Sequence, residues 1–301
     1  MRRDWREVIS REIRCELRWD EPMSSHTSFG IGGPADMLAI PSSEEDVIKI
    51  VSLARDMDVP VLAIGAGTNV LVRDKGIRGL VIKLSGGMKG FRICGDAVLA
   101  EAGSGLPEIL SACAEEGLGG LEFAIGIPGT VGGAVVMNAG AWGYCIGDLV
   151  DRVRISSLDG DIMEFGREDM EFGYRWSRMP SEGIITWVKL LLRPSDPEDI
   201  KEAMRGFLEM RRSSQPVGMR SAGSVFKNPD DSTKAGYLIE MVGLKGEVCG
   251  GAMISERHAN FIVNLGSASA DDVLRLIEMA RERVLSCFGI GLELELKVVG
   301  E

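Results

Sequence analysis

The sequence AIGIPGTVGGAVVMNAGAWG, residues 124–143, contains six glycines, and no charged residue lies between Glu122 and Asp148. Such a run indicates a membrane span, main chain packed closely on main chain, or a loop whose main chain lies against a ligand. Pro128, Asn138 and the glycines leave the run without sustained Leu, Ile or Phe, which argues against a span. Glycine has no Cβ to hold a ligand away, and Thr130 adds a polar group, so this wall would suit a flat aromatic ligand with a phosphate tail. Composition does not separate this reading from close packing.

The whole chain of 301 residues is 45% hydrophobic and 26% charged, as in ordinary globular proteins. The length suits two domains, or one large domain with an added lobe. The formal net charge of −11 at pH 7 argues against nucleic acid as a partner. The first residues, MRRDWREVISREIRCELRWDE, are too charged for a signal peptide.

The cysteines and histidines carry no sign of a disulfide framework or a metal site. The six cysteines are scattered without a C-x-x-C pair, which favours reduced thiols and a cytoplasmic protein. His26 and His258, the only histidines, lack a companion Cys or carboxylate motif, so we expect no metal.

Periodicity predicts both helices and strands, and therefore an α+β fold. Helices are expected after a capping box at Ser42 and Glu45, from Pro197, from Ala235 to Gly243, and from a cap at Ser269 to Gly289. Their expected core faces are Val47, Ile50, Val51 and Ala54; Ile200, Ala203, Met204 and Phe207; Leu238, Ile239 and Val242; and Val273, Ile277, Ala280, Val284 and Cys287.

The strand signals lie between these helices. V-P-V-L-A-I-G predicts a short buried strand, D-R-V-R-I-S-S-L-D-G-D-I-M-E-F a hairpin that turns at Asp159-Gly160, and I-I-T-W-V-K-L-L-L a further strand. R-P-S-D-P-E at 193–198 is the best candidate for a domain boundary.

A second glycine segment, V-L-A-I-G-A-G-T-N-V-L-V, ends the first of these strands. It is not a Rossmann loop, because Val70 occupies the third-glycine position and a β-type run follows instead of a helix. Two readings remain: a nest of backbone N–H groups for a phosphate at Gly65, Gly67, Thr68 and Asn69, or a glycine turn that joins two strands.

Six motifs in this order resemble the UDP-N-acetylenolpyruvoylglucosamine reductases. They are H-T-S-F-G-I-G-G-P-A-D at 26–36, G-A-G-T-N-V-L-V at 65–72, the glycine-rich run with its preceding G-L-E-F, F-G-Y-R-W-S at 172–177, S-A-G-S-V-F-K-N-P at 221–229 and E-R-H-A-N-F-I-V-N at 256–264, and L-E-L-E-L-K-V-V-G closes the chain. The resemblance covers nearly everything from His26 onward. With only three tyrosines, the chain resembles the shorter subclass of the family.

The resemblance implies a two-lobed FAD-binding region, like that of the vanillyl-alcohol-oxidase (PCMH) fold, followed by a C-terminal α+β substrate-binding domain. The expected divisions are an N-terminal helical segment over 1–25, the FAD-binding region over 26–194 with its lobes split near 80–85, and the substrate domain over 195–301. It also implies that NADPH, as co-substrate, reduces the enolpyruvyl UDP-sugar by way of FAD to UDP-N-acetylmuramate, in peptidoglycan precursor synthesis. We expect a monomer with a small-molecule substrate and with no nucleic acid or membrane partner.

The resemblance also assigns roles to residues. Arg175 corresponds to the arginine that grips the substrate carboxylate, Glu295 to the glutamate that stabilises the intermediate, and Ser224 to the proton donor. Cofactor contacts are expected from Gly65, Ala66, Gly67, Thr68, Asn69, Val70, Gly126, Ile127, Pro128, Gly129, Thr130, Gly132, Gly133, Asn138, Ala139 and Gly140. Substrate contacts are expected from Tyr174, Lys227, Asn228, Arg211 and His258.

Without the resemblance, each catalytic residue has an ordinary structural reading. Arg175 would be a surface charge, Ser224 a turn or strand end, and the alternating Glu293 and Glu295 the wet face of an edge strand. The chain also departs from the family pattern: Ser214 stands where a basic residue is common, Leu294 where proline is common, and Met253 where glutamine is common. Ser214 therefore predicts a weaker phosphate contact, and Leu294 predicts a less fixed entry to the last strand.

Two other functions compete with a reductase. A flavin oxidase would keep the fold and give its electrons to oxygen, but Arg175, Ser224 and Glu295 argue against it because alcohol oxidation needs a base. A nucleotide-sugar binder that has lost its flavin would be colourless and would take up no added FAD.

Overall fold

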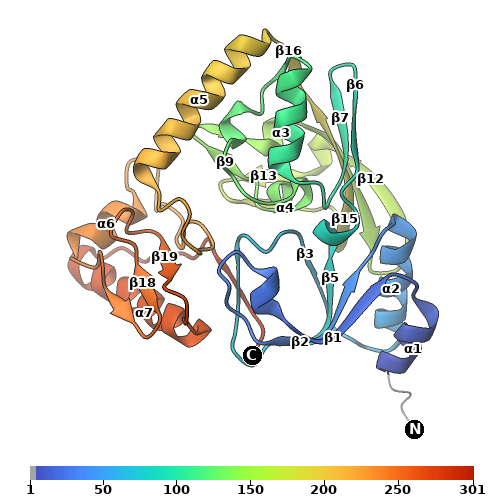
Figure 1. The fold of residues 1–301 in the computed structure, drawn as a ribbon, viewed down its shortest axis with the longest axis horizontal. Coiled ribbons are helices and arrows are strands. Elements are labelled where there is room, and N and C mark those ends of the chain that lie inside the picture. The colour runs from blue at the N-terminus through green and yellow to red at the C-terminus, as the bar shows by residue number, and fades with distance from the viewer. Residues whose placement is uncertain (1–4) are drawn as a thin grey trace. The chain divides into compact units, whose positions relative to one another are not determined.

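Helices and strands both occur throughout residues 5–301, the part of the chain that the computed structural model describes (Figure 1). The α+β class is therefore confirmed. The helices are α1 (Trp5–Glu12), α2 (Glu44–Asp56), α3 (Leu106–Glu115), α4 (Val131–Val136), α5 (Pro197–Ser214), α6 (Ala235–Met241) and α7 (Ala270–Phe288). Short 3-10 turns are η1 (Met23–His26), η2 (Leu84–Gly86), η3 (Glu122–Ala124), η4 (Ile146–Asp148) and η5 (Arg167–Asp169).

The strands are shorter and more numerous than the helices. They are β1 (Glu16–Pro22), β2 (Pro34–Ile40), β3 (Val61–Ile64), β4 (Val70–Val72), β5 (Ile77–Lys83), β6 (Phe91–Cys94), β7 (Ala97–Glu101), β8 (Leu118–Gly119), β9 (Gly140–Ala141), β10 (Tyr144–Cys145), β11 (Val150–Ser157), β12 (Ile162–Gly166), β13 (Glu171–Gly173), β14 (Trp176–Arg178), β15 (Gly183–Leu191), β16 (Arg193–Pro194), β17 (Val248–Cys249), β18 (Ala252–Ile254), β19 (Ile262–Asn264) and β20 (Lys297–Val299).

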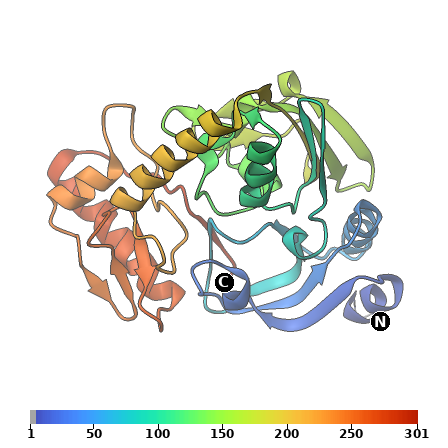
Figure 2. The same ribbon diagram turned by 45° about the horizontal axis from the view of Figure 1, so that its top comes forward.

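These strands form several separate sheets. The larger ones have the orders β1-β2-β5-β3, β12-β11-β15-β7-β6 and β17-β18-β19, and the two-stranded ones are β20-β4, β13-β14, β10-β9 and β16-β8. The five-stranded sheet is antiparallel throughout, and α4 packs against its strands β15 and β7. Helix α7 packs against the sheet β17-β18-β19 (Figures 1 and 2).

The chain divides into two compact units, neither of them continuous in sequence. Unit 1 contains the described residues up to Trp19 together with Met37–Ala66 and Gly79–Glu209. Unit 2 contains Asp20–Asp36, Gly67–Arg78 and Met210–Glu301. Each unit has its own hydrophobic core.

The segments Asp20–Asp36 and Gly67–Arg78 join the C-terminal residues because their apolar side chains complete the core of unit 2. Phe29 and Leu71 are buried in the same cluster as Phe226, and β4 pairs in parallel with β20. These two units do not coincide with the contiguous ranges predicted from the sequence. That residues 26–194 bind FAD and residues 195–301 bind the substrate stays a prediction. The segment predicted as helical over 1–25 contains α1 and also the strand β1, and its residues 1–4 lie outside the described part.

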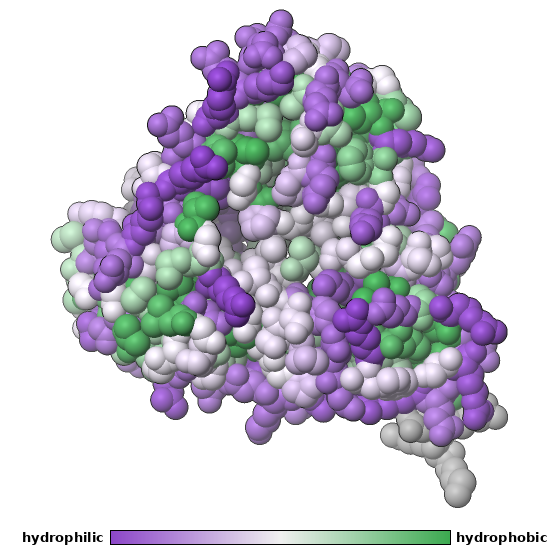
Figure 3. All heavy atoms as spheres, viewed as in Figure 1, coloured by the Kyte–Doolittle hydropathy of each residue, from purple (hydrophilic) through white to green (hydrophobic). Residues whose placement is uncertain are grey.

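Helix α5 buries fewer residues than its periodicity predicts. Ile200 is its one buried residue. Met204 and Phe207 are half-buried, whereas Ala203 is exposed, so the prediction was wrong for Ala203. Figure 3 shows mostly hydrophilic side chains along this helix.

The helix starts follow the predicted capping chemistry, with one shift. Helix α2 is capped by Ser43, whose side chain accepts a hydrogen bond from the N–H of Asp46, one residue later than the predicted pair. Helix α7 has the predicted capping box of Ser269 and Asp272. Its predicted core residues Val273, Ile277, Ala280 and Val284 are buried, but Cys287 is exposed, so that prediction was wrong.

Asp74, in the loop after β4, adds a second cap to α7. Its carboxylate oxygens accept hydrogen bonds from the N–H groups of Ala270 (2.8 Å) and Asp271 (3.0 Å). These N–H groups belong to the first turn, where a helix offers them no internal partner. Asp74 therefore ties the loop that follows the second glycine segment to the longest helix of unit 2.

We expect Asp74→Ala to reduce the free energy of unfolding by about 1 kcal/mol, within the usual range for a lost N-terminal cap. Asp74→Asn keeps one acceptor oxygen and should recover about half of that loss. Urea unfolding of the two variants and the wild type measures both effects. Equal stability of Asp74→Ala and the wild type would show that solvent replaces the carboxylate fully.

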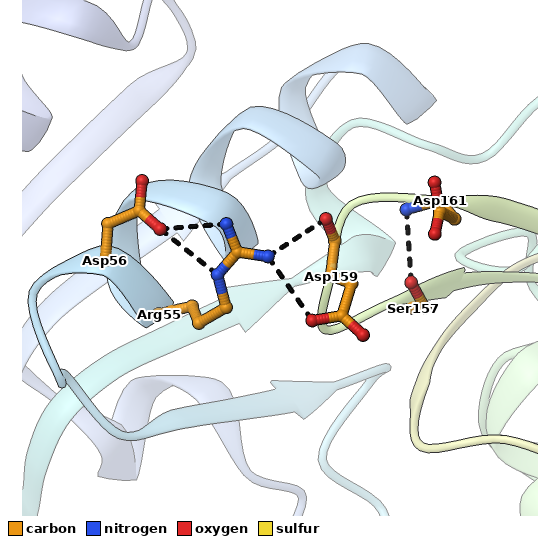
Figure 4. Close-up of polar contacts among 5 residues, drawn as sticks. All are labelled: Arg55, Asp56, Ser157, Asp159 and Asp161. Carbon is orange, nitrogen blue, oxygen red and sulfur yellow. Dashed lines mark hydrogen bonds and ion pairs between the residues drawn. The ribbon is translucent and has the colours of Figure 1, made fainter.

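The hairpin predicted to turn at Asp159-Gly160 is β11–β12. The N–H of Asp161 donates to the Ser157 hydroxyl (3.1 Å) across the turn. The guanidinium of Arg55, at the end of α2, donates to the carbonyl (3.1 Å) and carboxylate (3.3 Å) of Asp159 and also to Asp56 (Figure 4). This contact attaches the turn to α2.

The cysteines form no disulfide within the described residues, where all six are free thiols. Burial raises the pKa of Cys113 to about 12 and is the largest cause that raises that of Cys15 to about 11. Neither thiol is a nucleophile near neutral pH.

Candidate flavin and substrate site

The glycine-rich run at 124–143 is partly helical in the structure. After exposed and half-buried main chain at 125–129, Thr130 caps α4, its hydroxyl accepting a hydrogen bond from the N–H of Gly133 (3.3 Å). A short hairpin, β9–β10, follows α4. Thr130 is 3% exposed, so its hydroxyl serves the main chain of the run itself.

Close packing, one of the readings that the sequence left open, accounts for two glycines of the two glycine segments. A Cβ on Gly65 would lie 2.3 Å from the Thr130 hydroxyl oxygen, and one on Gly140 would lie 2.3 Å from the Tyr144 carbonyl oxygen, so protein packing alone requires glycine there. Gly126 differs, because it is exposed. Its φ of +72° belongs to the left-handed region, which glycine adopts without steric cost.

These residues fit the flat ring system of a flavin. The main chain around Gly126 is exposed, Ile125 and Ile127 flank it half-buried, and the nearest charged residues in sequence are Glu122 and Asp148. An uncharged surface of main chain offers a ring edge both donors and acceptors without competing side chains.

The second glycine segment joins β3 to β4, as predicted, and crosses from one unit to the other between Ala66 and Gly67. In unit 2, a Cβ on Gly67 would lie 2.1 Å from the carbonyl oxygen of His26. The Gly67 carbonyl accepts a hydrogen bond from the N–H of Ser28 (3.1 Å). Residues of the segment H-T-S-F-G-I-G-G therefore contact this loop and help to hold its main chain in place.

Asn69 joins the loop to the C-terminal strand. Its side-chain amide donates to the carbonyl of Glu295 (3.1 Å), and its own carbonyl accepts from the N–H of Lys297 (3.1 Å). Pairing of β4 with β20 continues this contact. The predicted cofactor loop thus holds the main chain that bears a predicted catalytic residue.

Ser224 and Glu295, which are far apart in sequence, lie on neighbouring segments of unit 2. The N–H of Glu295 donates to the carbonyl of Val225 (2.9 Å), and the N–H of Lys227 donates to the carbonyl of Glu293 (2.8 Å). Both catalytic candidates are half-buried. Glu295 therefore does not lie on the edge of a regular strand, since the segment makes one isolated bridge, Phe226 to Leu294.

Arg175 lies in unit 1, at the turn of the hairpin β13–β14. It is half-buried, and its φ of +62° is unusual for a residue with a side chain. Its guanidinium carbon lies 5.1 Å from the ring centroid of Tyr174, which is 50% exposed. The half-buried side chain, the left-handed backbone and the contact with an aromatic ring differ from what is expected of a fully exposed surface arginine.

The remaining substrate candidates belong to unit 2. Lys227 forms an ion pair with Glu293 (2.5 Å), and Asn228 accepts a hydrogen bond from the N–H of Ala235, the first residue of α6 (3.1 Å). Arg211 donates to the side-chain oxygen of Gln215 (3.0 Å). His258 accepts at Nδ1 from the N–H of Asn260 (3.2 Å). The structure groups these four with Ser224 and Glu295, whereas Tyr174 and Arg175 belong to unit 1.

The environment of His258 favours its neutral form. Burial, reinforced by the positive charge of Lys245, lowers the pKa of His258 below its ordinary value of 6.5. With Nδ1 as acceptor, Nε2 carries the proton and can donate a hydrogen bond.

This pKa predicts how stability depends on pH. Because the unfolded chain binds a proton at His258 more readily than the folded chain, the contribution is present above pH 6.5 and is lost as the pH falls below it. We expect the wild type to lose more stability than His258→Asn between about pH 7 and about pH 5 in urea unfolding. Parallel losses in the two proteins would contradict the assignment.

Sequence reasoning missed a set of buried asparagines that hold the site's main chain. Asn260 accepts from the N–H of Phe226 (2.9 Å) and donates to its carbonyl (2.8 Å). Asn264 donates to the carbonyl of Phe29 (2.9 Å) and accepts from Gly266 (2.8 Å). The available signal was an asparagine inside an apolar run, which must find partners once buried.

Comparison with known proteins supports the same assignment. Residues 35–166 match the model of an FAD binding domain, and residues 215–299 match the model of the UDP-N-acetylenolpyruvoylglucosamine reductase C-terminal domain. The reductase of Syntrophomonas wolfei is 45% identical over 286 residues, which is 95% of both chains. That of Moorella thermoacetica is 46% identical over 289 residues, 96% of this chain and 95% of its own.

Solved structures agree with this result. The UDP-N-acetylenolpyruvylglucosamine reductase of Thermus caldophilus matches with a TM-score of 0.82 and 38% identity, over 96% of this chain and 100% of its own. Berberine bridge enzyme from Eschscholzia californica matches with a TM-score of 0.50 and 19% identity, over 64% of this chain and 44% of its own, and shows likeness of fold alone.

Fold, domain matches and relatives together define an FAD-binding oxidoreductase. Within that class, the chain belongs to the UDP-N-acetylenolpyruvoylglucosamine reductase family. The predicted family, cofactor and enzyme class are thereby confirmed.

Proposed function

We propose that this chain reduces UDP-N-acetylglucosamine enolpyruvate to UDP-N-acetylmuramate, with NADPH as the source of electrons. The observation that carries the proposal is the placement of Ser224 and Glu295 on segments joined by main-chain hydrogen bonds at Val225, in a chain of this reductase family. A hydroxyl and a carboxyl held on such segments suit an acceptor that must take up a proton.

Bound FAD would supply the hydride, taken from NADPH, that is added to the enolpyruvyl β-carbon. The main chain of residues 65–70 and 126–140 would hold the cofactor. Arg175 would bind the substrate carboxylate through two parallel hydrogen bonds, which draws negative charge toward the carboxylate as it develops. Glu295 would stabilise the intermediate, and Ser224 would donate a proton to the α-carbon, a strongly basic centre at that stage.

The residues of unit 2 would bind the nucleotide sugar. Lys227 and Arg211 provide positive charge for a diphosphate in a chain whose formal net charge is −11. Asn228 and the Nε2–H of neutral His258 add uncharged hydrogen-bonding groups. Tyr174 would lie next to the carboxylate held by Arg175.

We also propose that the enzyme acts as a monomer in the cytoplasm, where its six scattered cysteines would stay reduced. Among the helices of residues 5–301, none combines the length and apolar character needed to cross a bilayer. Those same residues contain no group of three or more His, Cys, Asp and Glu side chains arranged to hold a metal.

The test is oxidation of NADPH that depends on added UDP-N-acetylglucosamine enolpyruvate, followed by mass-spectrometric detection of the reduced sugar. An alcohol oxidase would instead consume oxygen together with an alcohol and would show no NADPH oxidation that depends on the sugar. A non-catalytic binder would be purified colourless and would remain so after incubation with FAD. Either result would overturn the proposal.

A further inference from the structure

Asn138 uses its whole side chain to hold main chain of the protein. It is 6% exposed. Its Nδ2 donates to the carbonyl of Gly173 (2.9 Å), and its Oδ1 accepts from the N–H of Gly147 (3.0 Å). Its φ is +40°, a left-handed conformation that asparagine tolerates better than most residues. The conformation and both hydrogen bonds therefore select asparagine for a reason other than contact with a cofactor.

The acceptor Gly173 is the last residue of β13, and Arg175 follows two residues later in the turn. The opposite strand is also fixed, since the Ser177 hydroxyl donates to the carbonyl of Val136 at the end of α4 (3.1 Å). An isolated two-stranded hairpin is marginal in water, and β13 and β14 pair with no other strand among residues 5–301. Contacts to the glycine-rich run therefore replace the missing sheet neighbours.

The other partner of Asn138 is itself fixed. The carbonyl of Gly147 accepts from the guanidinium of Arg167 (2.8 Å), which also lies over the ring of Phe172 (6.0 Å to the centroid). A Cβ on Gly147 would lie 2.7 Å from the Phe172 ring and 2.8 Å from Asn138 Oδ1. Asn138 thus connects the hairpin to a region with little room to move.

We propose that Asn138 is a positioning residue: it couples the glycine-rich run to the hairpin and sets the orientation of Arg175 toward the substrate carboxylate. The proposal rests on the proposed function, because it gives Arg175 its role in that reaction. Two parallel hydrogen bonds to a carboxylate require the guanidinium plane to be aligned, and displacement by about 1 Å can slow a reaction roughly 10²-fold.

The principal variant is Asn138→Asp, which keeps the acceptor for Gly147 and the tolerance of positive φ but loses the donor to Gly173. Asn138→Gly keeps the backbone conformation and removes both hydrogen bonds, and it serves if the aspartate variant does not fold. Alanine is avoided because it lacks the short polar side chain that lets asparagine and aspartate tolerate this positive φ. Glu171→Gln is the matched control, since it removes the exposed ion pair of Glu171 with Arg178 in the same hairpin (3.2 Å).

Stopped-flow absorbance of the FAD-loaded proteins separates the two half-reactions. We expect Asn138→Asp to slow oxidation of the reduced FAD by the enolpyruvyl sugar about 10- to 100-fold, and to slow reduction of FAD by NADPH by a clearly smaller factor. In an Arg175→Ala background the same change should add less than about threefold, because the residue through which Asn138 acts is gone. Glu171→Gln should behave as the wild type.

Hydrogen exchange of amides 171–178, measured by mass spectrometry, provides a readout that does not require the reaction. Faster exchange in Asn138→Asp, but not in Glu171→Gln, supports the proposal. Unchanged exchange, or equal slowing of flavin oxidation by the sugar with and without Arg175, would overturn it. If the hydrogen exchange of Asn138→Asp is faster than that of the wild type but the wild type itself does not reduce the sugar, the proposed function is overturned. The assigned role of Asn138 in catalysis is then overturned with it.

Discussion

Ser224→Ala is expected to leave reduction by NADPH intact and to slow reoxidation by the enolpyruvyl sugar by roughly 10²–10⁴-fold, the usual contribution of a positioned proton donor. Ser224 belongs to unit 2, whereas the exposed run around Gly126 belongs to unit 1. Loss of the hydroxyl therefore removes the proposed proton donor without changing the residues of that run.

Single-turnover absorbance measurements test this expectation, with NADPH and the sugar added in separate experiments. Ser221→Ala is a suitable control, because Ser221 belongs to the same segment and its known contact is through its carbonyl, which accepts from Ser28 (2.7 Å). A deuterium isotope effect from solvent should be present in the wild type and altered in Ser224→Ala. If both half-reactions proceed at wild-type rates in the variant, the proton comes from elsewhere.

Arg175→Lys is expected to slow reoxidation by the sugar about 10²-fold or more and to leave reduction by NADPH unchanged. A lysine ammonium keeps the positive charge but cannot form the planar fork that grips two carboxylate oxygens. Arginine and lysine have the same unbranched stem at Cβ, so the left-handed backbone at this position, with φ of +62°, disfavours both alike and the comparison isolates the head group.

The matched control is Arg178→Lys, in the strand after the same turn, where the guanidinium makes an exposed pair with Glu171. Its turnover should equal that of the wild type. Full turnover by Arg175→Lys would mean that a point charge suffices, which would contradict bidentate binding of the carboxylate.

Local features of the fold could be predicted from the sequence because their causes are local. The capping box at Ser269 and the turn at Asp159-Gly160 are formed by neighbouring residues, and the structure contains both. Exposure was predicted less well. Ala203 and Cys287 fit the periodicity of buried faces but are exposed, because periodicity shows which residues share a face and not whether another element covers it.

The division of the chain could not be predicted in the same way. Asp20–Asp36 and Gly67–Arg78 join the C-terminal residues through contacts such as Phe29 with Asn264, which are distant in sequence. For the site, the family motifs identified Arg175, Ser224 and Glu295 as candidates. They did not indicate that Asn69 and Asn138 hold the main chain near these residues, because a hydrogen bond from a side chain to a distant carbonyl leaves no periodic pattern.

The parallel pairing of β4 with β20 also bears on how the protein is made. Val70–Val72 leaves the ribosome more than two hundred residues before Lys297–Val299, its partner in the finished sheet. Until those last residues emerge, the early segment lacks its neighbour strand, and until residues 222–296 emerge it also lacks most of the core it completes. In a series of nascent chains halted at increasing lengths before Lys297, protection from protease should therefore appear at shorter lengths within Gly79–Glu209 than within Gly67–Arg78.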